Sequence, residues 1–72
     1  MNRDIIKGNW KEIKGKLKQQ WGKLTDDEID QIDGSYDELE GILQKSYGYQ
    51  KEQAKREIET FLDINHWTEK TL

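Results

Sequence analysis

Two stretches of the chain carry large apolar side chains at the spacing of a single helix face. Neighbouring apolar positions are three or four residues apart in both stretches. They are Trp10, Ile13, Leu17, Trp21 and Leu24, followed by Tyr36, Leu39, Leu43 and Tyr47. This spacing is typical of amphipathic helices that bury one face. We therefore predict two helices, with Trp10 and Trp21 in the core.

Polar residues mark where the helices begin. Three residues suited to helix capping are followed by Glu three positions later, which is the spacing of a capping box: Asn9 with Glu12, Thr25 with Glu28, and Ser35 with Glu38. The box at Thr25 opens a short helix that carries Ile29 and Ile32. This helix is predicted to end before Asp33-Gly34.

The remaining segments add one further helix and two short ends. A fourth main helix begins near residues 50–51 and is predicted to bury Ala54, Ile58, Phe61 and Leu62. Residues 2–7 are predicted to form a short turn that Gly8 interrupts. We expect a single domain over residues 1–64 and a frayed tail over residues 65–72.

The chain repeats itself with a shift of 26 residues. Over residues 6–32, identical residues fall together at seven positions: Ile6 with Ile32, Gly8 with Gly34, Glu12 with Glu38, Gly15 with Gly41, Leu17 with Leu43, Gly22 with Gly48, and Ile32 with Ile58. Because the repeat retains glycines and large apolar residues, the two copies are predicted to share turns and packing. We predict an all-α fold in which four main helices form two pseudo-symmetric α-hairpins around one core.

Four of the repeated glycines have predicted roles. Gly22 and Gly48 stand just past the long apolar stripes, where helices favour a left-handed residue. Gly15 and Gly41 lie within helices, where glycine costs about 1 kcal/mol relative to alanine. We favour a close helix crossing at these two positions. The alternative is that both are tolerated on the solvent-facing side.

Composition restricts the chemistry of the chain. Of 72 residues, 32% are hydrophobic and 38% are charged, so any core is small. The absence of cysteine excludes disulfides, thiolate metal sites and cysteine nucleophiles. His66 is the single histidine, and Ile29 and Gln31 stand where a calcium loop needs acids. We therefore expect no metal, no cofactor and no enzyme activity.

Hydropathy favours a location in the cytoplasm. The longest uninterrupted apolar run has two residues, whereas about 20 are needed to span a bilayer. The first eight residues do not have the pattern of a secretory signal. We therefore expect no transmembrane segment and a cytoplasmic protein.

Four short motifs resemble those of a known protein family. They are Gly8-Asn9-Trp10, Lys14-Gly15-Lys16, Trp21-Gly22-Lys23-Leu24-Thr25-Asp26-Asp27 and Tyr47-Gly48-Tyr49-Gln50. Over about residues 1–60 the chain resembles the CsbD-like family of small bacterial proteins. The resemblance implies a soluble, non-enzymatic protein of the general stress response. It also implies a fold similar to SAM domains, with two orthogonally packed α-hairpins, and it supplies no catalytic or binding residues.

Charge is distributed unevenly along the chain, whose net charge is −3. Residues 1–24 carry seven Lys or Arg and two Asp or Glu, whereas residues 25–72 carry five and thirteen. A basic stripe of Lys7, Lys11, Lys14 and Lys18 has acidic or neutral repeat equivalents at Asp33, Asp37, Glu40 and Gln44. One interpretation is that both stripes only keep the protein soluble.

The other interpretation is that the stripes are complementary surfaces, which join copies of the chain or bind charged partners. Exposed ion pairs contribute only about 0–1 kcal/mol each, so such contacts are weak and sensitive to salt. The sequence identifies no partner.

Three functions are consistent with these patterns. The first is a non-enzymatic helical stress protein that acts through its charged surface. The alternative is a nucleic-acid-binding module that uses the basic first helix and the hairpin turns at residues 21–23 and 47–49, although the second hairpin is acidic. The third is membrane-surface attachment through Trp10, Trp21 and nearby lysines. We favour a core position for both tryptophans over membrane attachment.

Overall fold

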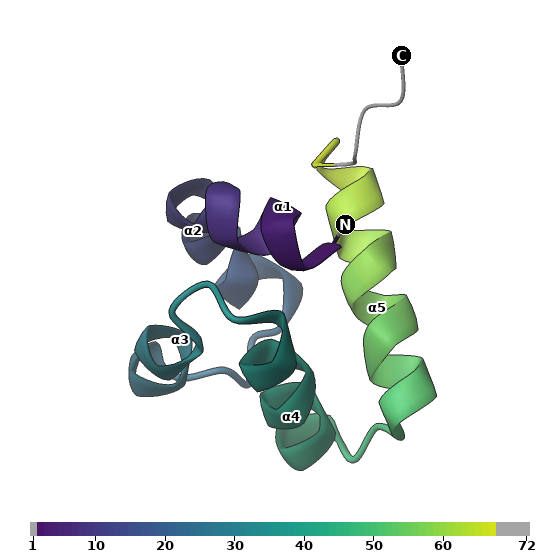
Figure 1. The fold of residues 1–72 in the computed structure, drawn as a ribbon. Coiled ribbons are helices and arrows are strands. Elements are labelled where there is room, and N and C mark those ends of the chain that lie inside the picture. The colour runs from purple at the N-terminus through teal and green to yellow at the C-terminus, as the bar shows by residue number, and fades with distance from the viewer. Residues whose placement is uncertain (1, 68–72) are drawn as a thin grey trace.

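The computed structural model describes residues 2–67, and these residues form five α-helices (Figure 1). In chain order the helices are α1 (Asn2–Gly8), α2 (Trp10–Gln20), α3 (Asp26–Ile32), α4 (Tyr36–Tyr47) and α5 (Lys51–Ile64). The predicted all-α class is confirmed for this part of the chain. The structure has five helices where the sequence predicts four main ones, because residues 2–7 belong to a helix rather than to a turn.

Helix α1 is held in place by two isoleucines. Ile6 is fully buried and Ile5 is nearly so, and burial of two large aliphatic side chains stabilises a helix too short to be stable alone. The side-chain amide of Asn9 donates a hydrogen bond to the carbonyl of Ile5 at 3.0 Å. Asn9 thus completes the end of α1 and makes no side-chain cap for α2, so the predicted capping box with Glu12 is wrong.

The predicted cap of α3 is confirmed, and that of α4 is found in part. At α3 the Thr25 hydroxyl accepts a hydrogen bond from the backbone N–H of Glu28 at 3.1 Å. The Glu28 carboxylate accepts one from the backbone N–H of Thr25 at 3.0 Å, which completes the box. At α4 the Ser35 hydroxyl accepts a bond from the backbone N–H of Glu38 at 3.3 Å, which is the first half of a box.

The two long helices end differently, although their sequences repeat. Helix α4 ends at Gly48 in the predicted left-handed conformation, with φ of 72°. Helix α2 ends at Gln20, and its C-cap residue is Trp21, whose φ of −129° lies outside the left-handed region. The predicted left-handed role of Gly22 is therefore wrong. The Trp21 side chain is buried against Phe61, with ring centroids 5.0 Å apart, so the chain leaves the helix at this anchored residue.

The connection between α3 and α4 uses two left-handed residues in succession. Asp33 has φ of 44° and Gly34 has φ of 82°. A side chain at Gly34 would also meet Trp10, because an ideal Cβ there lies 3.6 Å from the Trp10 Cβ. The predicted stop at Asp33-Gly34 is confirmed. The left-handed backbone is what favours glycine at position 34, because a Cβ there would be at ordinary contact distance from Trp10.

All five helices contribute to one core, and α4 packs against α1, α3 and α5. The buried apolar residues are Ile5, Ile6, Ile13, Leu17, Trp21, Leu24, Ile29, Ile32, Tyr36, Leu39, Ile42, Leu43, Ala54, Ile58, Phe61 and Leu62. The four residues predicted for the buried face of α5 are among them. Trp21 is buried as predicted, whereas Trp10 is only partly buried and packs against the edge of the core.

The two mid-helix glycines do not mark a close helix crossing. Gly15 and Gly41 are exposed, and an ideal Cβ built at either position meets no other atom within 4 Å. The favoured prediction of close packing is therefore wrong, and the solvent-facing alternative is correct.

The repeat in sequence corresponds to a repeat in helix order. Shifted by 26 residues, α2 falls on α4, and α3 falls on the first half of α5. The helix ends at Trp21 and Gly48 break this correspondence. The repeated apolar stripes thus specify helices, while the turns are fixed by their own contacts.

After α5 the chain turns back onto the core. His66 has φ of 64°, and the backbone N–H of Trp67 donates a hydrogen bond to the carbonyl of Leu62 at 2.9 Å. The Trp67 ring then packs edge-on against Phe61, with centroids 5.6 Å apart. Of the segment predicted as a frayed tail, residues 68–72 lie outside the described part of the chain.

Candidate interaction surface

The four lysines of the predicted basic stripe are all exposed, but two of them already face acids of the same molecule. Lys18 Nζ lies 2.8 Å from Asp26 Oδ1, and Lys14 Nζ lies 3.5 Å from Asp30 Oδ1. Both acids belong to α3. Two of the three stripe lysines on α2 therefore belong to an ion-paired seam between α2 and α3.

The predicted acidic stripe is not a continuous surface. Asp33 and Asp37 are exposed, but Glu40 is buried, with 6% of its surface exposed. One of its carboxylate oxygens, Oε2, is buried and has no hydrogen-bond partner within residues 2–67. Glu40 follows Tyr36 by four residues and precedes Leu43 by three, so helical geometry places it on the buried face. This spacing is the sequence signal for its burial.

An arginine outside the predicted stripe binds the second acid. The Arg3 guanidinium donates two hydrogen bonds to the Asp37 carboxylate, at 2.8 Å and 3.1 Å. The guanidinium carbon also lies 5.8 Å from the centre of the Tyr36 ring. Arginine prefers this bidentate geometry, in which its planar guanidinium binds both oxygens of a carboxylate. The interaction, together with the Tyr36 contact, links α1 to the start of α4.

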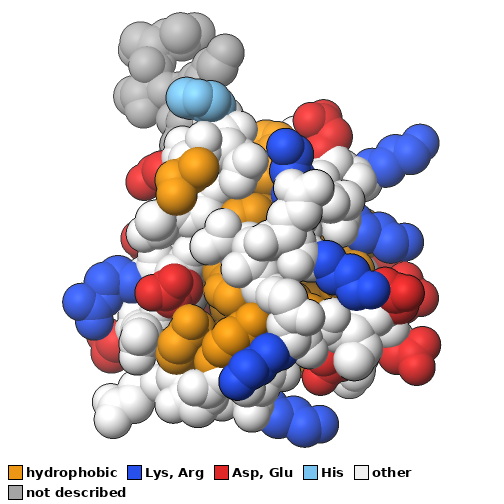
Figure 2. Space-filling model, turned by 180° about the vertical axis from the view of Figure 1, so that it is seen from behind, with side chains coloured by type: hydrophobic (Ala, Val, Ile, Leu, Met, Phe, Trp, Pro, Cys, Tyr) orange, Lys and Arg blue, Asp and Glu red, His pale blue; other side chains and the backbone are white. Residues whose placement is uncertain are grey.

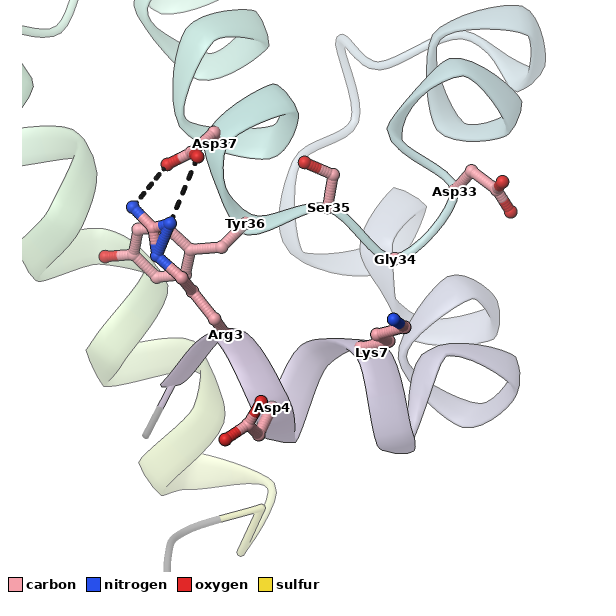
Figure 3. A pocket seen from close by; sticks show the side chains of 8 residues that line it. All are labelled: Arg3, Asp4, Lys7, Asp33, Gly34, Ser35, Tyr36 and Asp37. Atoms are coloured by element: carbon pink, nitrogen blue, oxygen red, sulfur yellow. Dashed lines mark hydrogen bonds and ion pairs between the residues drawn. The ribbon is translucent and has the colours of Figure 1, made fainter.

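The structure brings three of the seven predicted residues together around one open pocket. Lys7, Asp33 and Asp37 line it, together with Arg3 and Asp4 from α1. Figure 3 shows the Arg3 side chain extending from α1 to Asp37 at the start of α4, while the Asp4 side chain points away from the connection between α3 and α4. The pocket has a volume of about 360 Å³. It is lined by charges of both signs, which leaves no strong preference for an anion or a cation. Lys11 does not line it.

The charged groups perturb two neighbours. Hydrogen bonding to Lys18, together with the positive charge of Lys18, lowers the pKa of Asp26 below its usual value. Burial raises the pKa of Tyr36, and the negative charge of Glu40 raises it further. The shift at Asp26 reflects its solvent-exposed ion pair with Lys18. The shift at Tyr36 reflects burial of its phenol next to the Glu40 carboxylate.

All three ion pairs described here join the basic N-terminal third to the acidic remainder of the chain. Their side chains are between 51% and 82% exposed, so solvent screens each pair and its contribution to stability is small. Figure 2 shows Lys or Arg and Asp or Glu side chains next to one another along one edge of the molecule. The opposite charges seen in the sequence therefore meet within the fold at these three places.

Two further properties follow from the described residues. No group of three His, Asp or Glu side chains in residues 2–67 is placed to hold a metal ion. Across the same residues, every helix is too short or too polar to cross a membrane.

A second surface cluster joins the two hairpin turns named in the sequence analysis, at residues 21–23 and 47–49, whose contact was not predicted. The backbone N–H of Lys23 donates a hydrogen bond to the Tyr47 hydroxyl at 3.2 Å, and Lys23 Nζ lies 5.1 Å from the centre of the same ring. Tyr47 and Tyr49 stack, with centroids 5.3 Å apart and ring planes 15° apart. The available signal was that both residues flank a repeated glycine, but the sequence alone does not show that the two turns meet.

Comparison with known proteins gives the family. The sequence model described as CsbD-like matches residues 4–56. The chain is 51% identical over 69 residues to UPF0337 protein ECA0631 of Pectobacterium atrosepticum, covering 93% of this chain and all of the relative. It is 57% identical over 58 residues to UPF0337 protein YjbJ of Escherichia coli K12, covering 81% of this chain and 84% of the relative. These matches confirm the resemblance found in the motifs, and the chain belongs to the CsbD-like family.

Proposed function

We propose that this chain is a non-enzymatic protein of the bacterial cytoplasm, of the general stress-response type, that acts through weak contacts of its charged surface. The observation that carries the proposal is that only some lysines of the basic stripe are engaged in ion pairs. Within residues 2–67, the ion pairs involve Lys14 and Lys18 but neither Lys7 nor Lys11, and both of these lysines are exposed. The Lys7–Lys11 end of the stripe is the part available to an anionic partner.

Charge and size set the strength of such contacts. Two exposed lysines supply about 0–1 kcal/mol each, so binding depends on several contacts and weakens as salt rises. This fits a protein that acts when it is abundant rather than one that binds a single partner tightly. Asp33 lines the same pocket as Lys7 and disfavours strongly anionic partners there, whereas Asp37 is paired with Arg3.

The architecture we propose for this function is the SAM-like pairing of two pseudo-symmetric α-hairpins within a domain of residues 1–64. It is supported by the match of α2 with α4 and of α3 with α5 under the 26-residue shift, and by packing of α4 against α3 and α5. In this arrangement Lys7 on α1 and Lys11 on α2 are both exposed to solvent.

The test is a comparison of captured proteins with a charge-reversed variant. The wild-type chain, a Lys7→Glu/Lys11→Glu variant and a matched Lys45→Glu/Lys55→Glu variant are immobilised and exposed to lysates of stressed and unstressed cells. We expect the first variant alone to lose the bound proteins, and about 0.5 M salt to release them from the wild type. Identical capture by all three chains, or capture that salt does not alter, would contradict the proposal.

A further inference from the structure

The turn after α2 and the turn after α4 form one composite surface. Lys23 comes from the first turn, and Tyr47 and Tyr49 flank the second. A hydrogen bond from the Lys23 backbone to the Tyr47 hydroxyl fixes the two turns to each other. We call Lys23, Tyr47 and Tyr49 the turn patch. It lies at the end of α4 and the start of α5, away from the pocket shown in Figure 3.

The turn patch combines aromatic faces with a cation at the surface. Tyr47 and Tyr49 are only partly buried, and Lys23 is exposed. The Tyr47 and Tyr49 rings are nearly parallel, which is the arrangement that stacked bases also adopt. Figure 2 shows an apolar area low on the rear face with Lys or Arg side chains at its edge, at the end of the molecule where Figure 1 places the turn between α4 and α5.

The backbone beside the rings is open. Gly48 separates the two tyrosines, is exposed, and has space around the position of a missing Cβ. Lys45 and Lys51 stand two residues before and after the tyrosine pair, and both are exposed. Burial raises the pKa of Tyr49, and the negative charge of Glu57 raises it further. Glu57 is therefore an acid close to the patch. The patch therefore offers a flat π surface with lysines nearby rather than a deep pocket.

We propose that the turn patch binds single-stranded nucleic acid, with a base stacked on the Tyr47–Tyr49 pair and Lys23 against a phosphate. Stacking on aromatic side chains and neutralisation of the backbone are the two contacts that single strands use without sequence preference. A duplex keeps its bases stacked inside and offers the tyrosines no free face. Because three side chains form the patch, binding is weak and loses strength with salt.

This inference stands apart from the proposed function. The turn patch shares no residue with the Lys7–Lys11 surface, so failure of one proposal leaves the other in place. It retains the two hairpin turns of the nucleic-acid alternative predicted from the sequence and leaves out the basic first helix, where Lys14 and Lys18 are engaged by acids of α3.

The experiment measures fluorescence anisotropy of a labelled strand of about twelve deoxythymidines in low salt, a length within the usual site size. The comparison probes are a duplex and an abasic sugar–phosphate strand of equal length. We expect binding of the thymidine strand, and at least about fivefold weaker binding of both comparison probes, since stacking contributes about 1–3 kcal/mol per base. No binding at several hundred micromolar, or equal binding of the abasic strand, would overturn the proposal.

Variants separate stacking from general charge. Tyr49→Leu keeps an apolar side chain but removes the ring, and it is expected to weaken binding at least fivefold. Tyr49→Phe keeps the ring and is expected to bind like the wild type. Lys23→Ala is expected to weaken binding and to reduce its salt dependence. The matched control is Lys16→Ala, because Lys16 lies beside Ile64 and Asn65 at the far end of α5. An equal effect of the Lys16 and Lys23 variants, or retained binding by Tyr49→Leu, would refute the assignment. Thermal melts establish that each variant is folded.

Discussion

At the residue scale, His66 occupies a left-handed backbone conformation that residues other than glycine rarely adopt. Its φ of 64° allows the next residue, Trp67, to hydrogen-bond back to Leu62 and to pack on Phe61. This is the usual way in which a helix end satisfies its last carbonyls. The strain at His66 is tolerated because the Trp67 ring closes one side of the core.

We therefore predict that His66→Gly stabilises the protein. Glycine adopts the left-handed conformation without strain, and we expect a gain of about 0.5–1 kcal/mol after its greater entropy in the unfolded chain is included. The measurement is urea unfolding followed by circular dichroism. Asn65→Gly is the control and is expected to destabilise, because Asn65 has an ordinary φ and its amide caps the Phe61 carbonyl. A loss of stability in His66→Gly would be inconsistent with the turn described here.

A second residue-scale prediction concerns Asp26 and pH. The Lys18 hydrogen bond lowers the pKa of Asp26 from 3.8, so the native state binds this proton less readily than the unfolded chain. The pair therefore adds stability above the unfolded pKa, and this contribution is lost as pH falls through the lower folded value. At low salt, Asp26→Asn is expected to make the free energy of unfolding depend less on pH below about 5. We expect about 1 M NaCl to reduce this difference from the wild type.

The control for this titration is the neighbouring exposed acid Asp27, which lies outside the Lys18 pair. Stability is measured by urea unfolding at several pH values for wild type, Asp26→Asn and Asp27→Asn. We expect the Asp26 variant alone to lose part of the acid dependence. Matching curves for the wild type and Asp26→Asn would show that the ion pair does not form in solution.

At the element scale, the outer faces of α2 and α4 carry glycines that no packing requires. Gly15 and Gly41 have ordinary helical φ and open space around them. We predict that Gly15→Ala and Gly41→Ala each stabilise the protein by about 0.4–1 kcal/mol, because alanine restricts the unfolded chain and favours helix. Thermal unfolding monitored at 222 nm checks the change.

Two glycines with left-handed backbones serve as controls for the same substitution. Gly34 has φ of 82° and Gly48 has φ of 72°, so alanine at either position is strained. We expect alanine to destabilise at both positions. At Gly34 the new Cβ would lie 3.6 Å from Trp10, which is an ordinary contact, so the backbone conformation is the cause there too. Stabilisation by alanine at Gly34, or destabilisation at both Gly15 and Gly41, would contradict the helix positions.

At the scale of the whole molecule, apolar periodicity predicts most of the helices and little of what joins them. The 3,4,4 spacing identifies α2 and α4, and the same period within α5 identifies its buried face. The sequence leaves open whether residues 2–7 form a helix, since α1, a seven-residue segment with only two isoleucines, has too weak a pattern. Its stability comes from contact with a core that the local sequence does not contain.

The candidate surface was less predictable than the fold for the same reason. The stripe of lysines follows from the sequence, but its partners depend on which helices pack side by side. Arg3 meets Asp37 across 34 residues, and Lys23 meets Tyr47 across 24. Charge spacing along one helix shows which residues share a face. It does not show that the opposing charges face each other within the same molecule.

The central claim is that one small core, anchored by Trp21 and surrounded by all five helices, holds the molecule together. The most direct test compares the thermal unfolding of Trp21→Ala with that of Trp10→Ala. Trp21 is 2% exposed and contacts Phe61, whereas Trp10 is only partly buried at the edge. We predict that Trp21→Ala costs about 3–5 kcal/mol and leaves little or no cooperative unfolding, while Trp10→Ala retains a clear transition. A Trp21→Ala melt within a few degrees of wild type would contradict the claim.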